Sequence, residues 1–131
     1  SKEPIAVYSA YEKQTLQSLA RTFPKKVKRI EAVINRLVDL LPIVRSSIYL
    51  RKFRGSFSIK SVAPALSSIS YANLGVADGR TASALFEQLD DGDLTEDQAN
   101  TIRADLLAYC CQDTLALVRV HERLRAMASK G

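Results

Sequence analysis

The chain has 131 residues, of which 47% are hydrophobic and 25% are charged, a composition typical of one soluble globular domain. This composition excludes a disordered tail, a collagen-like repeat and a disulfide scaffold. The longest uncharged run, residues 61–77, contains proline, glycine and asparagine, so we expect no membrane span. Cys110 and Cys111 are adjacent and cannot bridge each other, which favours buried free thiols in a cytoplasmic protein.

The formal net charge of +5 is unevenly distributed. Residues 1–60 contain 13 Lys and Arg against 4 Asp and Glu, whereas residues 61–131 contain 6 against 10. A basic surface attracts phosphate backbones or acidic partners. The cluster of Lys25, Lys26, Lys28 and Arg29 is therefore a candidate nucleic-acid contact, and a second basic cluster spans 51–54. Solvated helix and loop faces are the alternative interpretation of both clusters.

The first third of the chain predicts one strand and two helices. Residues 5–8 form a short apolar run after a proline and predict a strand. Apolar residues then recur at helical spacing over 11–22, with Ser9 as the expected N-cap. A second stripe at three- and four-residue steps predicts a helix over 24–41. A lone strand cannot satisfy the hydrogen-bonding groups of its backbone. Either residues 48–50 pair with it, or its partners lie outside this sequence.

The rest of the chain predicts three further helices, over 59–66, 79–89 and 96–127. Ser58 and Asp78 are expected at the starts of the first two, and residues 95–98 form a capping box before the third. The resulting fold class is mainly α, with about five helices and one or two short strands in a single domain, 1–131. Asp90 to Asp93 resembles a calcium loop only superficially, because the closing Glu is absent.

Two acidic constellations could carry chemistry. Glu12 follows the predicted strand directly, at the position where ligands commonly bind in α/β folds. Tyr109 and Asp113 are four residues apart and share one helix face, where a phenol and a carboxylate can hold a water and a metal ion. Structural roles are the alternative: Glu12 as a first-turn charge, and Tyr109 as a core residue. The single histidine, His121, has no ligand or catalytic partner at a suitable spacing.

These constellations, taken in order, resemble the acidic motifs of the DEDD-type 3′–5′ exonucleases of the ribonuclease-H-like superfamily. The stretch 8–12 (Tyr-Ser-Ala-Tyr-Glu) is similar to the second motif of that family, and 109–113 is similar to the third. The stretch 55–60 (Gly-Ser-Phe-Ser-Ile-Lys) is similar to a segment of an uncharacterised bacterial family that carries such an exonuclease-like region. The stretches 71–79 and 113–116 extend this likeness over nearly the whole chain.

The resemblance implies the carboxyl-terminal portion of a ribonuclease-H-like α/β fold that lacks its first strands. It implies nucleic acid as substrate, with Glu12 and Asp113 as ligands of Mg²⁺ or Mn²⁺ and with Tyr109 orienting the attacking water. Two departures matter: Ser9 stands where the family has Asn, and Glu12 stands where it has Asp. The first motif, with its Asp and Glu, has no counterpart. We therefore expect an inactive or nearly inactive fragment of a larger protein, which covers its exposed apolar faces by forming a homodimer.

Two other interpretations remain open. The chain could be a non-enzymatic helical module that binds a protein partner or nucleic acid through its basic half. It could also be a degenerate exonuclease fold retained only for architecture.

Overall fold

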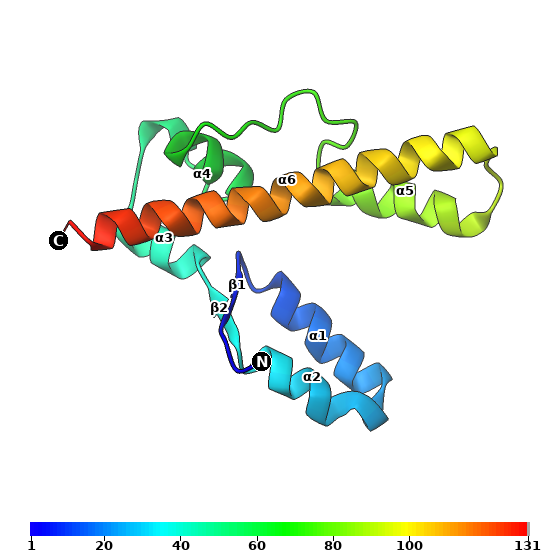
Figure 1. Ribbon diagram of the computed structural model, residues 1–131, viewed down its shortest axis with the longest axis horizontal. Helices are drawn as coiled ribbons and strands as arrows, with labels where there is room; N and C mark the ends of the chain where they lie inside the picture. Colours follow the sequence, from blue (N-terminus) through cyan, green and yellow to red (C-terminus); the bar gives the residue numbers. More distant parts are fainter. Residues whose placement is uncertain (131) are drawn as a thin grey trace.

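The computed structural model describes residues 1–130, which form two lobes, the second of which is built along one long helix (Figure 1). The amino-terminal lobe is a β-α-β unit. Strand β1 (Ile5–Val7) leads into helix α1 (Tyr11–Thr22), the short 3-10 turn η1 (Pro24–Lys26), helix α2 (Val27–Ile34) and strand β2 (Leu37–Asp39). Helices α1 and α2 pack against each other as a hairpin to the right of the strands in this view.

The two strands are parallel, with Ile5 opposite Leu37 and Val7 opposite Asp39. Hydrogen bonds extend the ladder at both ends, from Ile5 N to Arg36 O and from Leu40 N to Val7 O. Because the backbone groups of a strand alternate between its two sides, those of Ala6 face the other edge of β1. Within residues 1–130 that edge carries no further strand, since the sheet has only two.

The expected helix over 24–41 is wrong in its second half. It ends at Ile34, and Leu37–Asp39 instead form β2. The expected pairing of β1 with residues 48–50 is also wrong, because β2 takes that place and 48–50 belong to no strand. Leu37 and Val38 fit a helical stripe in sequence, but their backbone groups form hydrogen bonds with β1 instead. A local pattern does not reveal a partner so far away in the chain.

The second lobe contains α3 (Leu41–Ser47), the 3-10 turn η2 (Arg51–Phe53), α4 (Ile59–Leu66), α5 (Gly79–Asp91) and α6 (Glu96–Ala128). The expected helices over 59–66, 79–89 and 96–127 are confirmed, and α3 raises the number of α-helices in residues 1–130 to six. Helix α6 has 33 residues and is about 50 Å long. Its capping box forms as predicted: Thr95 accepts from the Gln98 amide, and the Gln98 side chain accepts from the Thr95 amide.

The core lies where α3, η2 and α4 meet the carboxyl-terminal half of α6. Its fully buried members are Val44, Phe53, Val62, Ala63, Ala116 and Val120. The β-α-β unit joins this core through Tyr8, whose hydroxyl donates a hydrogen bond of 2.6 Å to the Phe57 carbonyl. The fold class is therefore mainly α with two short strands, as the sequence predicted.

The chain exposes an unusually large surface. Its accessible area is 9560 Å², whereas a compact monomer of 14.5 kDa exposes about 6,900 Å². Twelve large hydrophobic side chains are exposed, including Tyr11, Tyr49, Phe86 and Leu107. Cys110 and Cys111 are exposed as well, so the prediction of buried thiols is wrong. Among the described residues, no helix combines the length and the hydrophobicity needed to cross a membrane.

Candidate functional site

Asp113 lies midway along α6 in a cluster with two tyrosines. Tyr109 is one turn earlier on the same helix and is buried, while Tyr71 approaches from the loop between α4 and α5. Burial raises the pKa of Tyr71 above its usual range, and the neighbouring Asp113 carboxylate and Tyr109 raise it further. Neither Tyr71 Oη nor Asp113 Oδ1 has a well-formed hydrogen bond within the described residues, although both atoms are buried. The cluster therefore places a buried phenol, which can donate a hydrogen bond, beside a buried carboxylate oxygen, which can accept one.

Lys60 places a positive charge over this cluster. Its Nζ lies 4.9 Å from the centre of the Tyr109 ring and 6.0 Å from that of Tyr71. The same ammonium donates a hydrogen bond of 2.7 Å to the Ala77 carbonyl. Lys60 is in the first turn of α4, so the Gly-Ser-Phe-Ser-Ile-Lys stretch positions a cation above the two rings.

The loop that carries Tyr71 is held against α6 at two further points. The Gln112 side chain donates a hydrogen bond to the Ser70 carbonyl. Gly75 approaches Asp105 so closely that a Cβ at this position would lie 2.5 Å from the Asp105 Cγ. A side chain at position 75 would force the Asp105 carboxylate to move, so the glycine lets the loop lie close along the helix on the side where Tyr71 meets Asp113.

A second polar group lies at the carboxyl ends of the two strands. Asp39 Oδ1 accepts hydrogen bonds from the Ser9 amide at 2.8 Å and from the Leu41 amide at 2.9 Å. Ser9 has a φ of 108° and marks a sharp exit from β1. Burial raises the pKa of Tyr8 to about 12, helped by Asp39 and opposed by Arg45. The Asp39 carboxylate thus ties the two strand ends together.

Glu12 is in the first turn of α1, directly beyond these strand ends. It is half-buried, and its Oε2 is a third buried oxygen without a hydrogen-bond partner in residues 1–130. The expected N-cap differs slightly: Ala10 is the N-cap residue, while the Ser9 hydroxyl accepts from the Tyr11 amide at 3.2 Å. No hydrogen bond or ion pair joins Glu12 to Tyr109 or Asp113 in the described part of the chain. Their convergence on one site stays a prediction.

The donor set fits only part of a metal site. A buried carboxylate oxygen without a donor is a suitable ligand for a hard cation, and Glu12 and Asp113 each offer one. Within residues 1–130, however, no group of three or more His, Cys, Asp or Glu side chains could surround a metal ion. Mg²⁺ needs several oxygen ligands, so residues 1–130 do not supply a complete coordination sphere.

The predicted nucleic-acid cluster lies elsewhere. Lys25, Lys26, Lys28 and Arg29 are exposed at the connection from α1 to α2. Figure 1 shows this connection at the opposite end of α1 from Glu12, and the 12 residues of α1 correspond to about 18 Å. The structure therefore does not bring these four cations next to Glu12.

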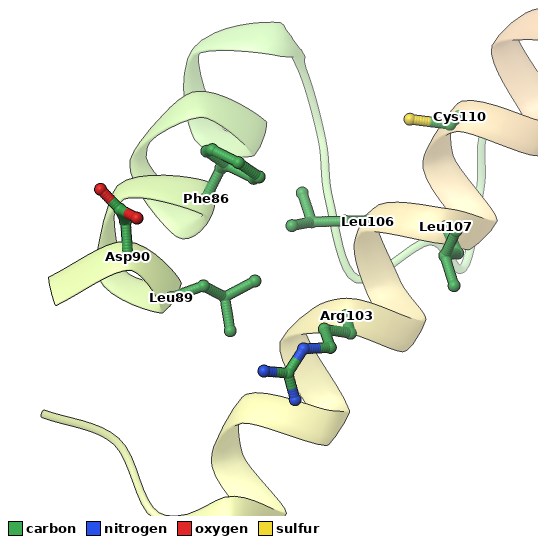
Figure 2. A pocket seen from close by; sticks show the side chains of 7 residues that line it. All are labelled: Phe86, Leu89, Asp90, Arg103, Leu106, Leu107 and Cys110. Atoms are coloured by element: carbon green, nitrogen blue, oxygen red, sulfur yellow. The ribbon is translucent and has the colours of Figure 1, made fainter. Parts of the chain in front are cut away.

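An apolar hollow of about 440 Å³ opens between α5 and α6 (Figure 2). Phe86 and Leu89 line it from α5, and Leu106, Leu107 and Cys110 from α6. Asp90 and Arg103 are its charged members. Phe86 and Leu107 are each about two-thirds exposed, so the hollow is an uncovered helix–helix groove rather than an enclosed chemical site.

Sequence reasoning missed three residues of these polar groups. Tyr71 and Lys60 appear in the sequence analysis only within the stretches 71–79 and 55–60 that resemble an uncharacterised family. Asp39 falls inside the helix predicted over 24–41. An aspartate followed by two leucines and a proline is a helix-start signal that identifies Asp39 as the end of a preceding element. Nothing in the local sequence indicates that Tyr71 reaches Asp113, because 42 residues separate them.

Residues 1–58 match a family described as a domain of unknown function (DUF2779). The matched segment covers the β-α-β unit, α3 and η2, and ends where α4 begins. It includes Glu12 and Asp39, whereas Tyr109 and Asp113 lie outside it. No curated protein and no solved structure matches the chain.

Proposed function

We propose that the chain is the carboxyl-terminal part of a metal-dependent 3′–5′ exonuclease that acts on nucleic acid, and that alone it is inactive or nearly so. In this proposal Glu12 and Asp113 hold Mg²⁺ or Mn²⁺ together with carboxylates from a further strand, and Tyr109 orients the attacking water. The divalent ion supplies an activated water for phosphodiester hydrolysis.

The observation that carries the proposal is the pair of buried carboxylate oxygens without donors, Glu12 Oε2 and Asp113 Oδ1. Leaving a buried acceptor unpaired costs about 1–3 kcal/mol, so chains rarely retain two such carboxylates for structure alone. A cation removes this cost because it provides the missing partner for both oxygens.

The open sheet supports the incomplete-site part of the proposal. Parallel sheets are normally buried and have more than two strands. The free edge of β1 carries the backbone groups of Ala6, and a strand added there would end beside Ser9 and Glu12, where further carboxylates are needed. The surface of 9560 Å² exceeds the expectation for a compact monomer by roughly 2,700 Å². An added strand or a second copy of the chain would cover part of this excess.

A nuclease assay with Mn²⁺ tests the proposal, with labelled single-stranded oligonucleotides as substrate. We expect no cleavage by the 131-residue chain and 3′-to-5′ shortening by the longer protein that contains it. Asp113→Ala in the longer protein should abolish cleavage, whereas Glu87→Ala, an exposed acid on α5, should leave it unchanged. Strong cleavage by the chain alone that is lost in Asp113→Ala would contradict the half-site, and an inactive longer protein would contradict the enzyme.

The alternative is a non-enzymatic helical module that binds a protein partner or nucleic acid through its basic half, and one observation favours it. The side chains of Lys25, Lys26, Lys28 and Arg29 are all exposed, and no ion pair within residues 1–130 neutralises them, as expected for a surface that binds an acidic partner. If this is the function, charge reversal at 25–29 or 51–54 abolishes the activity of the longer protein in cells, while Asp113→Ala has no effect. Exposed free thiols at Cys110 and Cys111 support a cytoplasmic location under either function.

A further inference from the structure

We propose that an aromatic platform, whose exposed member is Tyr49, and the basic turn beside it bind single-stranded nucleic acid. The platform consists of Tyr49, Phe53 and Phe57, and the basic turn consists of Arg51, Lys52 and Arg54. This inference deepens the proposed function by naming the surface that binds the nucleic acid. It rests on that function only for the cleavage of the nucleic acid after binding. The predicted guide at Lys25–Arg29 is a separate surface.

The charge around the platform has one sign. Residues 40–77 contain no Asp or Glu but have five cations, three of them in the basic turn. The other two are Arg45 and Lys60. The nearest carboxylate at the strand ends, Asp39, is occupied by two backbone amides. The segment therefore has a formal charge of +5, of which Lys60 faces Asp78 and the other four cations favour a phosphate backbone as ligand.

The aromatic rings form a connected group with one exposed member. The ring centres of Tyr49 and Phe53 are 6.3 Å apart, and those of Phe53 and Phe57 are 5.9 Å apart. Phe53 is fully buried in the core, whereas the Tyr49 side chain is 65% exposed. Tyr49 is thus held by a buried ring while its own ring remains available. Arg45 lies 5.8 Å from the centre of the Phe57 ring and adds a cation at the same place.

Two hollows flank the turn at Arg54 and Gly55, both of which have left-handed backbone conformations. One hollow, of about 320 Å³, is lined by Lys52, Arg54 and Lys60 and by no acid. The other, of about 620 Å³, has Arg45 and Phe57 in its wall and reaches Tyr8 and Ser9 at the end of β1. A single strand of nucleic acid that crosses the turn would pass from the hollow lined by cations to the hollow that contains Phe57 and reaches the end of β1, shortly before Glu12.

Single-stranded nucleic acid fits this arrangement better than other polyanions do. Proteins that bind single strands combine cations for the backbone with aromatic rings on which bases stack. An acidic protein would use the cations, but it supplies no nucleobase to stack on the exposed Tyr49 ring. A duplex keeps its bases stacked internally and cannot use the ring. We therefore expect binding to depend on both Tyr49 and the basic turn.

Fluorescence anisotropy measures this binding, with the 131-residue chain, a labelled oligothymidylate of about 12 nucleotides and EDTA to prevent cleavage. Tyr49→Ala should weaken binding between about 5-fold and 100-fold, which corresponds to the loss of one stacked base. Tyr49→Phe should preserve binding. Phe86→Ala is the matched control, because Phe86 is similarly exposed, at 64%, but lies on α5.

A charge-matched pair of triple variants tests the basic turn. R51Q/K52Q/R54Q should weaken binding and reduce the slope of log K against log salt by about 2, from the loss of three phosphate contacts. K25Q/K26Q/K28Q removes the same charge from the α1–α2 connection and should change both quantities much less. Circular dichroism confirms the fold of each variant, and all six substituted cations are exposed.

Three results would overturn the proposal. The first is equal weakening by the two triple variants, which would indicate net charge alone. The second is an unchanged affinity in Tyr49→Ala, and the third is tighter binding to a matched duplex or to vesicles of anionic lipid. The proposed exonuclease fails separately: cleavage by the longer protein can be absent while this binding persists.

Discussion

Replacing Asp113 with asparagine distinguishes a residue retained for function from one retained for structure. Asp113 Oδ1 is buried beside Tyr71 but accepts no well-formed hydrogen bond in residues 1–130. Asparagine has the same shape and no charge, so the substitution removes the cost of burying an unpaired carboxylate and leaves the packing intact. We expect Asp113→Asn to stabilise the chain in the absence of metal.

The magnitude follows from the burial of this side chain. An unpaired buried acceptor costs about 1–3 kcal/mol, and Asp113 is only half-buried, so the gain should lie near the lower bound of about 1 kcal/mol. Unfolding entropy scales with length at about 2.1 cal/mol/K per residue, so this gain raises the melting temperature of the 131-residue chain by about 4 °C. Thermal unfolding followed by circular dichroism in EDTA measures the shift.

Glu87→Gln provides the control, because it removes one exposed negative charge from α5, and the Glu87 side chain makes no hydrogen bond or ion pair in the described residues. Its effect should stay within about 0.5 kcal/mol. If Asp113→Asn lowers the melting temperature by several degrees, the carboxylate serves the structure through Tyr71. The argument that Asp113 awaits a cation would then be refuted.

Three further predictions concern the same regions. A double-mutant cycle of Glu12→Gln and Asp113→Asn, followed by urea unfolding, should show a coupling of about 0.5 kcal/mol or more if both carboxylates share one pocket. If the two changes in unfolding free energy simply add, the carboxylates lie in separate places. The folded state raises the pKa of Tyr8 from 10.0 to about 12, so the contribution of Tyr8 to the free energy of unfolding is complete below pH 10 and is lost as the pH rises through 12. This loss is about 1 kcal/mol after allowance for solvent exposure, and urea unfolding of Tyr8→Phe should not show it. Gly75→Ala should destabilise the chain by about 1–2 kcal/mol because its Cβ meets the Asp105 carboxylate, and Asp105→Ala should relieve most of this cost.

The accuracy of the sequence predictions depended on how local the signals were. The start of α6 was predicted correctly because Thr95 and Gln98 satisfy each other's amides without help from the rest of the fold. Strand β2 was missed because three residues give too short a pattern, and only its pairing with β1 distinguishes it from a helix. The burial of the cysteines was wrong for a geometric reason. The buried face of α6 follows Tyr109, Ala116 and Val120, and the next two positions after Tyr109 turn away from it.

The candidate site was predictable only within single elements. Tyr109 and Asp113 share a face of α6 because four residues complete one turn, a relation that sequence spacing contains. The approach of Tyr71 depends on Gly75 lying against Asp105 and on Gln112 holding Ser70, two tertiary contacts that no periodicity encodes.

The junction between the two lobes lies between the open sheet and the basic turn, and it sets how the lobe with Glu12 sits on the lobe with Asp113. The β-α-β unit is attached through α3 and through the hydrogen bond from Tyr8 to Phe57, a member of the aromatic platform. A strand added to β1 would extend the sheet beside Glu12, and a nucleic acid in the adjoining hollow would contact Tyr8 from the other lobe. Each would therefore fix the β-α-β unit against the core that carries Asp113. Binding at the platform should stabilise this junction, and hydrogen exchange of the Ser9 and Leu41 amides, which report on Asp39, should slow when oligonucleotide is added.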